Sequence, residues 1–135
     1  MQTDLILNFK PIFDSKSLAK EINYLAPDTS EIRLLCQMDS GGFCHCTLPP
    51  GKVSSPVKHK TVSELWYCVS GSGEIWQARN GDIQVMKFTT GDSFTIPVGN
   101  AFQFRNTGDA NLCVLIATIP KWPGANEAEP AKGYW

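Results

Sequence analysis

His59 and Glu64 are the two side chains whose types and spacing best suit chemistry in this sequence. An imidazole titrates close to neutral pH, and apolar surroundings raise the pKa of a carboxylic acid, so such a pair can act as general acid and base. The same two groups can instead hydrogen-bond an organic ligand, or bond each other and the backbone without doing chemistry. We expect them to form the polar part of a site, with these three roles left open.

Cysteine side chains could add to this site. On a strand that begins at Glu64, alternation places Cys68 on the same face, where its sulfur could be a third metal ligand. Cys44 and Cys46 share one face of another predicted strand and His45 takes the other. Buried cysteine is more often a small core residue than a ligand, so we favour core packing for these thiols. The five cysteines lack the regular spacing of disulfide-stapled proteins, so we expect them reduced, with a single disulfide as the alternative.

The spacing of apolar residues predicts the secondary structure of the rest of the chain. From about position 31, apolar residues recur at every second position between turns rich in Gly, Pro and Asn, which predicts short strands. The predicted strands are Glu31–Gln37, Phe43–Leu48, Glu64–Val69, Glu74–Ala78, Ile83–Phe88, Ser93–Ile96, Phe102–Asn106 and Leu112–Thr118. The Asn80-Gly81 pair is the strongest hairpin signal. Many short strands joined by tight turns predict an all-β sandwich or jelly-roll barrel.

Upstream of these strands we expect an arm and a helix. The segment Leu5–Phe13 contains Pro11, which suits an edge strand or an extended arm that pairs with a second copy of the chain. From position 14 or 15 to about 25, apolar residues recur at helical spacing behind a capping residue, and Pro27 follows. These apolar residues are Leu18, Ile22 and Leu25. We therefore predict one short N-terminal helix.

Composition excludes several classes of protein. Of the 135 residues, 42% are hydrophobic and 19% are charged, which fits one folded globular domain. Twelve Lys and Arg against thirteen Asp and Glu, without a basic block, make nucleic acid an unexpected partner. No apolar run reaches the roughly 20 residues that cross a bilayer, and the first residues do not form a signal peptide. We expect no membrane contact and a cytoplasmic location.

Two spaced motifs resemble those of the cupin superfamily. Their residues are Gly51, Val57, His59, Glu64 and Gly71 in the first motif, and Gly91, Pro97, Gly99, Phe102 and Asn106 in the second. The resemblance covers roughly Leu48–Thr118. It implies a cupin-type double-stranded β-helix, or jelly-roll barrel, whose mouth usually binds a divalent metal through three His and one Glu. The expected single domain has an N-terminal arm and short helix at 1–30, a cupin β-barrel at 31–119 and a C-terminal tail at 120–135.

The metal pattern of the family is degenerate in this chain. The resemblance places one ligand at His59 and the carboxylate at Glu64, but the two other histidine positions carry Val57 and Phe102, which have no donor atom. Two ligands leave most coordination positions to water, and apolar neighbours solvate a dication badly. We expect no metal at full occupancy. A divalent metal (Fe, Mn, Ni or Zn) on His59, Glu64 and Cys68 is the alternative.

These residues favour a pocket for a small organic molecule, because such pockets are mostly apolar with a few placed polar groups. The expected ligand-binding residues are Val57, Trp66 and Phe102, and the candidate catalytic pair is His59 and Glu64. A small-molecule-binding barrel, with metal-independent catalysis as an extension, is the leading expectation. The alternatives are a metal-dependent cupin enzyme (dioxygenase, isomerase or decarboxylase) and a non-catalytic sensor or accessory module. The N-terminal arm and the pairing habit of small cupins predict a homodimer.

Overall fold

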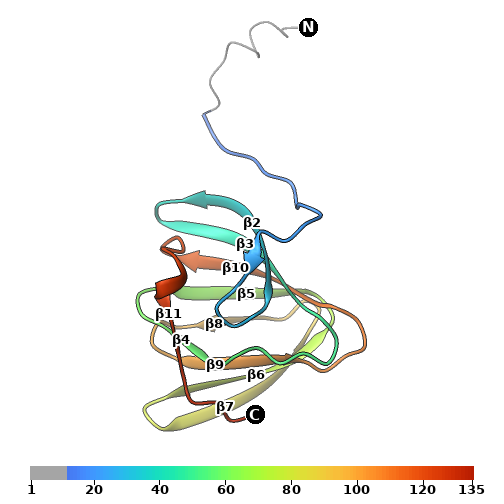
Figure 1. The fold of residues 1–135 in the computed structure, drawn as a ribbon, viewed down its shortest axis with the longest axis vertical. Helices are drawn as coiled ribbons and strands as arrows, with labels where there is room; N and C mark the ends of the chain where they lie inside the picture. The colour runs from blue at the N-terminus through green and yellow to red at the C-terminus, as the bar shows by residue number, and fades with distance from the viewer. Residues whose placement is uncertain (1–11) are drawn as a thin grey trace, which may run out of the picture.

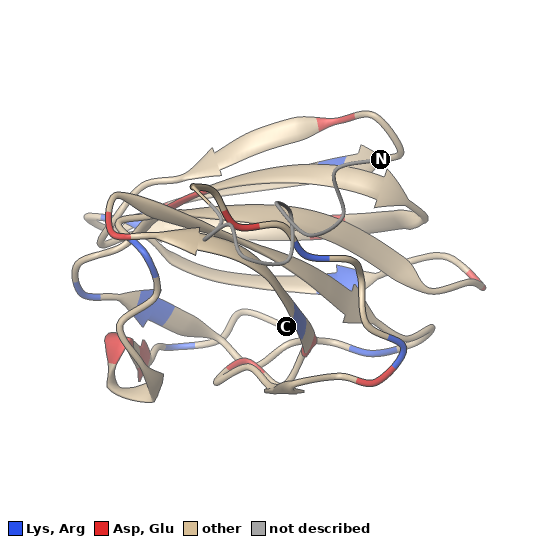
Figure 2. Cartoon of the chain, turned by 90° about the horizontal axis from the view of Figure 1, so that it is seen from above, with Lys and Arg blue, Asp and Glu red and all other residues tan. Residues whose placement is uncertain are grey.

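The computed structural model describes residues 12–135, which form two antiparallel sheets (Figure 1). The six-stranded sheet has the order β1-β2-β3-β10-β5-β8, and the five-stranded sheet has the order β11-β4-β9-β6-β7. The strands are β1 (Tyr24–Leu25), β2 (Glu31–Met38), β3 (Gly41–Leu48), β4 (Val57–His59), β5 (Ser63–Ser70), β6 (Ser72–Arg79), β7 (Asp82–Thr89), β8 (Ser93–Ile96), β9 (Ala101–Asn106), β10 (Leu112–Ile119) and β11 (Ala128–Pro130). A 3-10 turn, η1 (Ala125–Glu127), precedes β11. Figure 2 shows acidic and basic residues intermixed along the loops and strand ends.

All eight strands predicted from the sequence are present, and the expected all-β barrel architecture is confirmed. The strands that sequence reasoning missed are β1, β4 and β11. Each has only two or three residues, too few to show an alternating pattern. One of them, β4, carries part of the first motif, so a strand of three residues positions much of the site described below.

The predicted N-terminal helix is wrong: within residues 12–25 the structure contains no helix. The three apolar residues of the expected helical stripe are 52%, 37% and 58% exposed, so a helix here would have no core to pack against. The Arg33 side chain instead bonds the carbonyl oxygens of Ala19 and Lys20, holding the segment beside β2, and β1 pairs with β2. The predicted arm at Leu5–Phe13 falls almost wholly outside the described residues. No helix of residues 12–135 is long and apolar enough to cross a membrane.

Alternation along the strands builds the interior. In β5, Trp66 and Cys68 are buried while Leu65 and Tyr67 between and beside them are about half exposed. Inward side chains from both sheets join in a single core, in which the rings of Trp66 and Phe104 meet edge to face with centroids 4.8 Å apart. The strand period therefore decides which side chains can reach the interior.

The C-terminal tail adds β11 to the edge of the five-stranded sheet, and its last residues lie over the outer face of that sheet. Its strand β11 pairs with β4, and the ring of Tyr134 meets Trp76 of β6 edge to face at 4.8 Å. Just before β11, the buried Glu127 carboxylate accepts hydrogen bonds from the backbone N–H groups of Thr61 and Val62 and from the Thr61 hydroxyl. These bonds lower the pKa of Glu127. The carboxylate thus anchors the tail to the residues that follow β4.

Replacing Glu127 with alanine should destabilise the fold by about 2–3 kcal/mol, because the backbone donors of Thr61 and Val62 lose a charged acceptor. Glu129→Ala on the same tail is the matched control. It removes only a surface ion pair with Lys58 at 3.5 Å and should cost less than about 1 kcal/mol. Chemical denaturation measures both values, and equal losses would contradict the anchoring role of Glu127.

Candidate functional site

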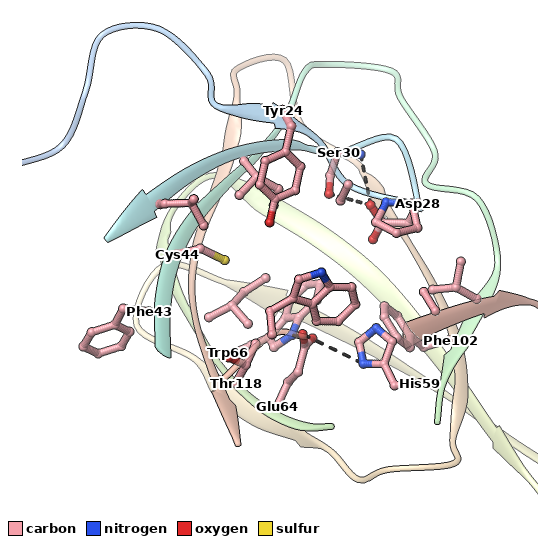
Figure 3. Close-up of a pocket in the computed structure, with 18 of the residues that line it drawn as sticks. Tyr24, Asp28, Ser30, Phe43, Cys44, His59, Glu64, Trp66, Phe102 and Thr118 are labelled. Carbon is pink, nitrogen blue, oxygen red and sulfur yellow. Dashed lines mark hydrogen bonds and ion pairs between the residues drawn. The ribbon is translucent and has the colours of Figure 1, made fainter. Parts of the chain in front are cut away.

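A pocket of about 60 Å³ opens into the barrel between the inward faces of the two sheets (Figure 3). Its wall contains all five residues that the sequence analysis placed in a ligand site, namely Val57, His59, Glu64, Trp66 and Phe102. Three strands supply them: β4, β5 and β9. The pocket wall is mainly apolar and aromatic, so the few polar groups within it face little water.

The two degenerate metal positions lie next to each other in the fold. Val57 of β4 is the direct cross-strand partner of Phe102 of β9, and both side chains are buried in the pocket wall. His59 follows two positions after Val57 on the same face of β4. The structure therefore brings His59 beside two apolar side chains at the places where the family pattern has histidines.

His59 and Glu64 face each other in the pocket. Nδ1 of His59 lies 3.9 Å from Oε2 of Glu64, and the other carboxyl oxygen accepts a hydrogen bond of 2.9 Å from the indole N–H of Trp66. The imidazole ring packs edge to face between Phe102 and Trp122, with centroids 5.2 and 5.1 Å away. Nδ1 is buried and has no hydrogen-bond partner among residues 12–135. The pair is close, yet too far apart for a direct hydrogen bond.

Desolvation keeps this pair neutral at neutral pH. Burial raises the pKa of Glu64 to about 8; the nearby Asp28 and Glu127 carboxylates add to the rise, and the Trp66 hydrogen bond opposes it. Burial also lowers the pKa of His59 below its usual value, against the opposing attraction of Glu127. The two groups are therefore a carboxylic acid beside a neutral imidazole, which is a proton donor beside a proton acceptor.

The remaining polar groups of the pocket come from residues that sequence reasoning missed. Tyr24 of β1, Asp28 of the following turn and Cys44 of β3 also line the pocket (Figure 3). Asp28 is buried and accepts two hydrogen bonds from Ser30, while burial raises its pKa. Burial raises the pKa of Cys44 to about 12, so it is a thiol. Alternation along β3 could have indicated Cys44, but no motif marks Asp28.

The expected third metal ligand is not in the pocket. Cys68 is buried on the same face of β5 as Glu64, but its sulfur points to the carbonyl oxygens of Ser70 and Gly71 at 3.6 and 3.8 Å. His45 takes the opposite face of β3 from Cys44, as alternation requires. Among residues 12–135, no three His, Cys, Asp or Glu side chains gather where a metal could bind. The donor set around His59 and Glu64 does not fit a divalent metal.

The fold is that of a cupin: a model of the cupin domain matches residues 44–118, more than half of the chain, and the chain belongs to that family. Similar solved structures include a deletion variant of Bacillus subtilis oxalate decarboxylase (TM-score 0.66, 17% identity, 76% of this chain and 29% of that chain). Another is peruvianin-I, a cysteine peptidase from Thevetia peruviana latex (TM-score 0.62, 21% identity, 68% of this chain and 56% of that chain). A third is the cupin domain of Drosophila melanogaster CENP-C (TM-score 0.62, 13% identity, 67% of each chain).

These likenesses confirm the fold. The chain spans less than a third of the oxalate decarboxylase chains that it matches, one of which has Mn(II) centres (TM-score 0.63, 17% identity, 76% of this chain and 28% of that chain). A divalent metal is thus within the range of this fold, although the residues of this pocket do not supply the usual donors. No match was found among curated proteins.

Restoring the missing donors should create a metal site. The double variant Val57→His and Phe102→His places two imidazoles on paired strands beside His59, and we expect its affinity for Mn(II) or Zn(II) to rise at least about 100-fold. The control is Leu65→His with Val85→His, which adds two exposed histidines on different sheets and should add no such site. Calorimetric titration of folded proteins measures both, and no gain in the first variant would mean that the inward geometry is wrong.

The buried acid should also shape the pH dependence of stability. Because the folded pKa of Glu64 is about 8 against an ordinary 4.5, stability due to this group falls as pH rises from about 4.5 to about 8. Glu64→Gln removes that loss, so its advantage over the wild type should grow by on the order of 2–4 kcal/mol between pH 5 and pH 8. His59 acts in the opposite sense below pH 6.5 in both proteins. Denaturant titrations of both proteins across this range measure the free energy of unfolding at each pH. If the two proteins show the same pH dependence, the pKa of Glu64 is not raised by burial.

Proposed function

We propose that this protein is a cupin barrel that binds a small organic molecule, with His59 and Glu64 as the polar contacts and with Val57, Trp66 and Phe102 as the apolar wall. The observation that carries the proposal is the Nδ1 atom of His59, which faces Glu64 in the pocket and has no partner within residues 12–135. A buried polar atom without a hydrogen bond costs about 1–3 kcal/mol. A ligand that bonds this atom recovers that energy.

The size of the pocket limits the ligand. A cavity of about 60 Å³ has room for roughly four to six water-sized groups. It therefore accommodates a small molecule or the head of a longer one, whose remainder lies at the mouth. A module whose pocket is filled by its own side chains would not retain this space, so the volume supports ligand binding over a purely structural barrel.

Metal-independent acid–base catalysis is the second candidate function. Its support is the protonation state of the pair, because a neutral Glu64 can donate a proton to a bound molecule while the neutral His59 accepts one. Ligand contact needs only the geometry, whereas catalysis also needs a substrate whose reacting atoms reach both groups. The pocket supports binding more directly than it supports turnover.

We also propose that the chain works as a cytoplasmic homodimer. Three outward residues of β5 support the pairing, because Leu65, Tyr67 and Val69 are 48%, 47% and 39% exposed on one sheet. A patch of exposed apolar side chains of this kind is typical of a protein interface. Light scattering behind size-exclusion chromatography would show twice the chain mass for a dimer, and a monomer at micromolar concentration would contradict the proposal.

A screen of small organic fragments tests the binding proposal. The chain has two histidines, so His45→Ala is a matched control for His59→Ala. We expect fragments that bind the wild type to lose about tenfold in affinity with His59→Ala and to bind His45→Ala unchanged, as followed by ligand-observed NMR. If no fragment depends on His59, the pocket is not a ligand site.

A further inference from the structure

Apart from His59, the titratable side chains of the described pocket wall are all acids. Asp28 and Glu64 are both 7% exposed, and Tyr24 and Cys44 are further acids in the same wall. The described residues that line the pocket include no Lys or Arg. The nearest cation along β4, Lys58, points outward and pairs with Glu129 at 3.5 Å. Two buried carboxyl groups therefore share a cavity in which these residues provide no Lys or Arg to pair with a carboxylate.

A second, independent observation indicates where a ligand would bond. The His59 side chain is 6% exposed, and its unpartnered Nδ1 faces Glu64 across the pocket (Figure 3). Oε1 of Glu64 already accepts the Trp66 indole N–H, which leaves Oε2 as the oxygen that faces His59. The polar gap therefore lies between two specific atoms, one a nitrogen that can accept a hydrogen bond and the other a carboxyl oxygen.

The width of this gap fits a single nitrogen donor. Nδ1 and Oε2 are 3.9 Å apart. For a nitrogen about 2.9 Å from each atom, the Nδ1···N···Oε2 angle would be about 85°. This is close enough to the angle between two N–H bonds of an ammonium group for both hydrogen bonds to form. A carboxylate ligand would instead place an oxygen acceptor against the Nδ1 acceptor of His59. The gap thus favours a ligand with at least two N–H donors on one atom.

The aromatic wall favours the same ligand charge. Phe102 and Trp122 flank His59, and Trp66 lies beside Phe102 with ring centroids 6.0 Å apart. The faces of aromatic rings attract cations, most strongly when water is excluded. An anion in this pocket would have no Lys or Arg in the described wall to balance it, whereas a cation would have carboxyl groups and aromatic rings nearby. The wall therefore favours amines over acids.

We infer that the pocket takes a small organic cation, a primary or secondary ammonium group whose nitrogen bridges Nδ1 of His59 and Oε2 of Glu64. This inference rests on the proposed function and names its ligand class. A bound cation would favour the ionised form of Glu64, whose proton leaves to solvent. Asp28 is a second carboxyl group in the wall, although Ser30 already bonds one of its oxygens. The small interior volume holds the ammonium head and one or two carbon atoms, and a longer substituent extends toward the mouth.

Three probes of similar size and different charge test the inference: ethylammonium, ethanol and acetate, added as titrants at constant ionic strength. The reporter is the indole N–H signal of Trp66 in the NMR spectrum of the labelled protein, because this group bonds Glu64 directly. We expect ethylammonium to shift this signal and to bind at least about tenfold more tightly than ethanol or acetate. Glu64→Gln, which keeps the shape of the side chain, should reduce ethylammonium binding about tenfold. The outward-facing Glu129→Gln should leave it unchanged.

Equal or tighter binding of acetate or ethanol would overturn the inference, as would ethylammonium binding that survives Glu64→Gln. Absence of any shift with ethylammonium would overturn it as well. If in these cases fragments from the wider screen still lose affinity with His59→Ala, the proposed function stands and only the ligand class is wrong. If no fragment depends on His59 either, both fail.

Discussion

Desolvation of His59 and Glu64 inside an aromatic wall is the constraint on which the character of this pocket depends. Burial raises the pKa of the acid and lowers that of the imidazole, so the two groups are neutral where an exposed pair would be an ion pair. Their neutrality lets two polar groups remain in an apolar interior at tolerable cost. It also makes them responsive to a ligand, because a ligand that bonds either group, or brings a charge close to it, changes the protonation equilibrium of that group.

Residues at both ends of the described chain complete the pocket. The match to the cupin domain covers residues 44–118, but Tyr24 and Asp28 precede that range and Trp122 follows it. Trp122 packs against His59, and the tail that carries it is anchored by Glu127 beside β4. The barrel therefore supplies the polar pair, while segments outside the matched range close the wall and contribute to what the pocket admits.

The sequence predicted the barrel and the polar pair for a definite physical reason. Alternation on strands is a local property, so eight strands and the inward direction of Glu64 and Trp66 can be inferred from residue order. The helix expected to end near Leu25 failed because its apolar stripe has nothing to pack on, which depends on tertiary contacts. Asp28 was not predicted as a pocket residue, because a residue in a turn is not part of any alternating pattern. Cys68 met the alternation rule and still points elsewhere, because its position along β5 is beyond the pocket.

The most direct test of the central claim, that the His59–Glu64 pair serves an organic ligand rather than a metal, is elemental analysis of protein purified without an affinity tag or chelator. The account predicts transition metal far below one mole per mole of chain. Near-stoichiometric Fe, Mn, Ni or Zn would contradict it, because the pair would then be part of a metal centre completed by an atypical ligand.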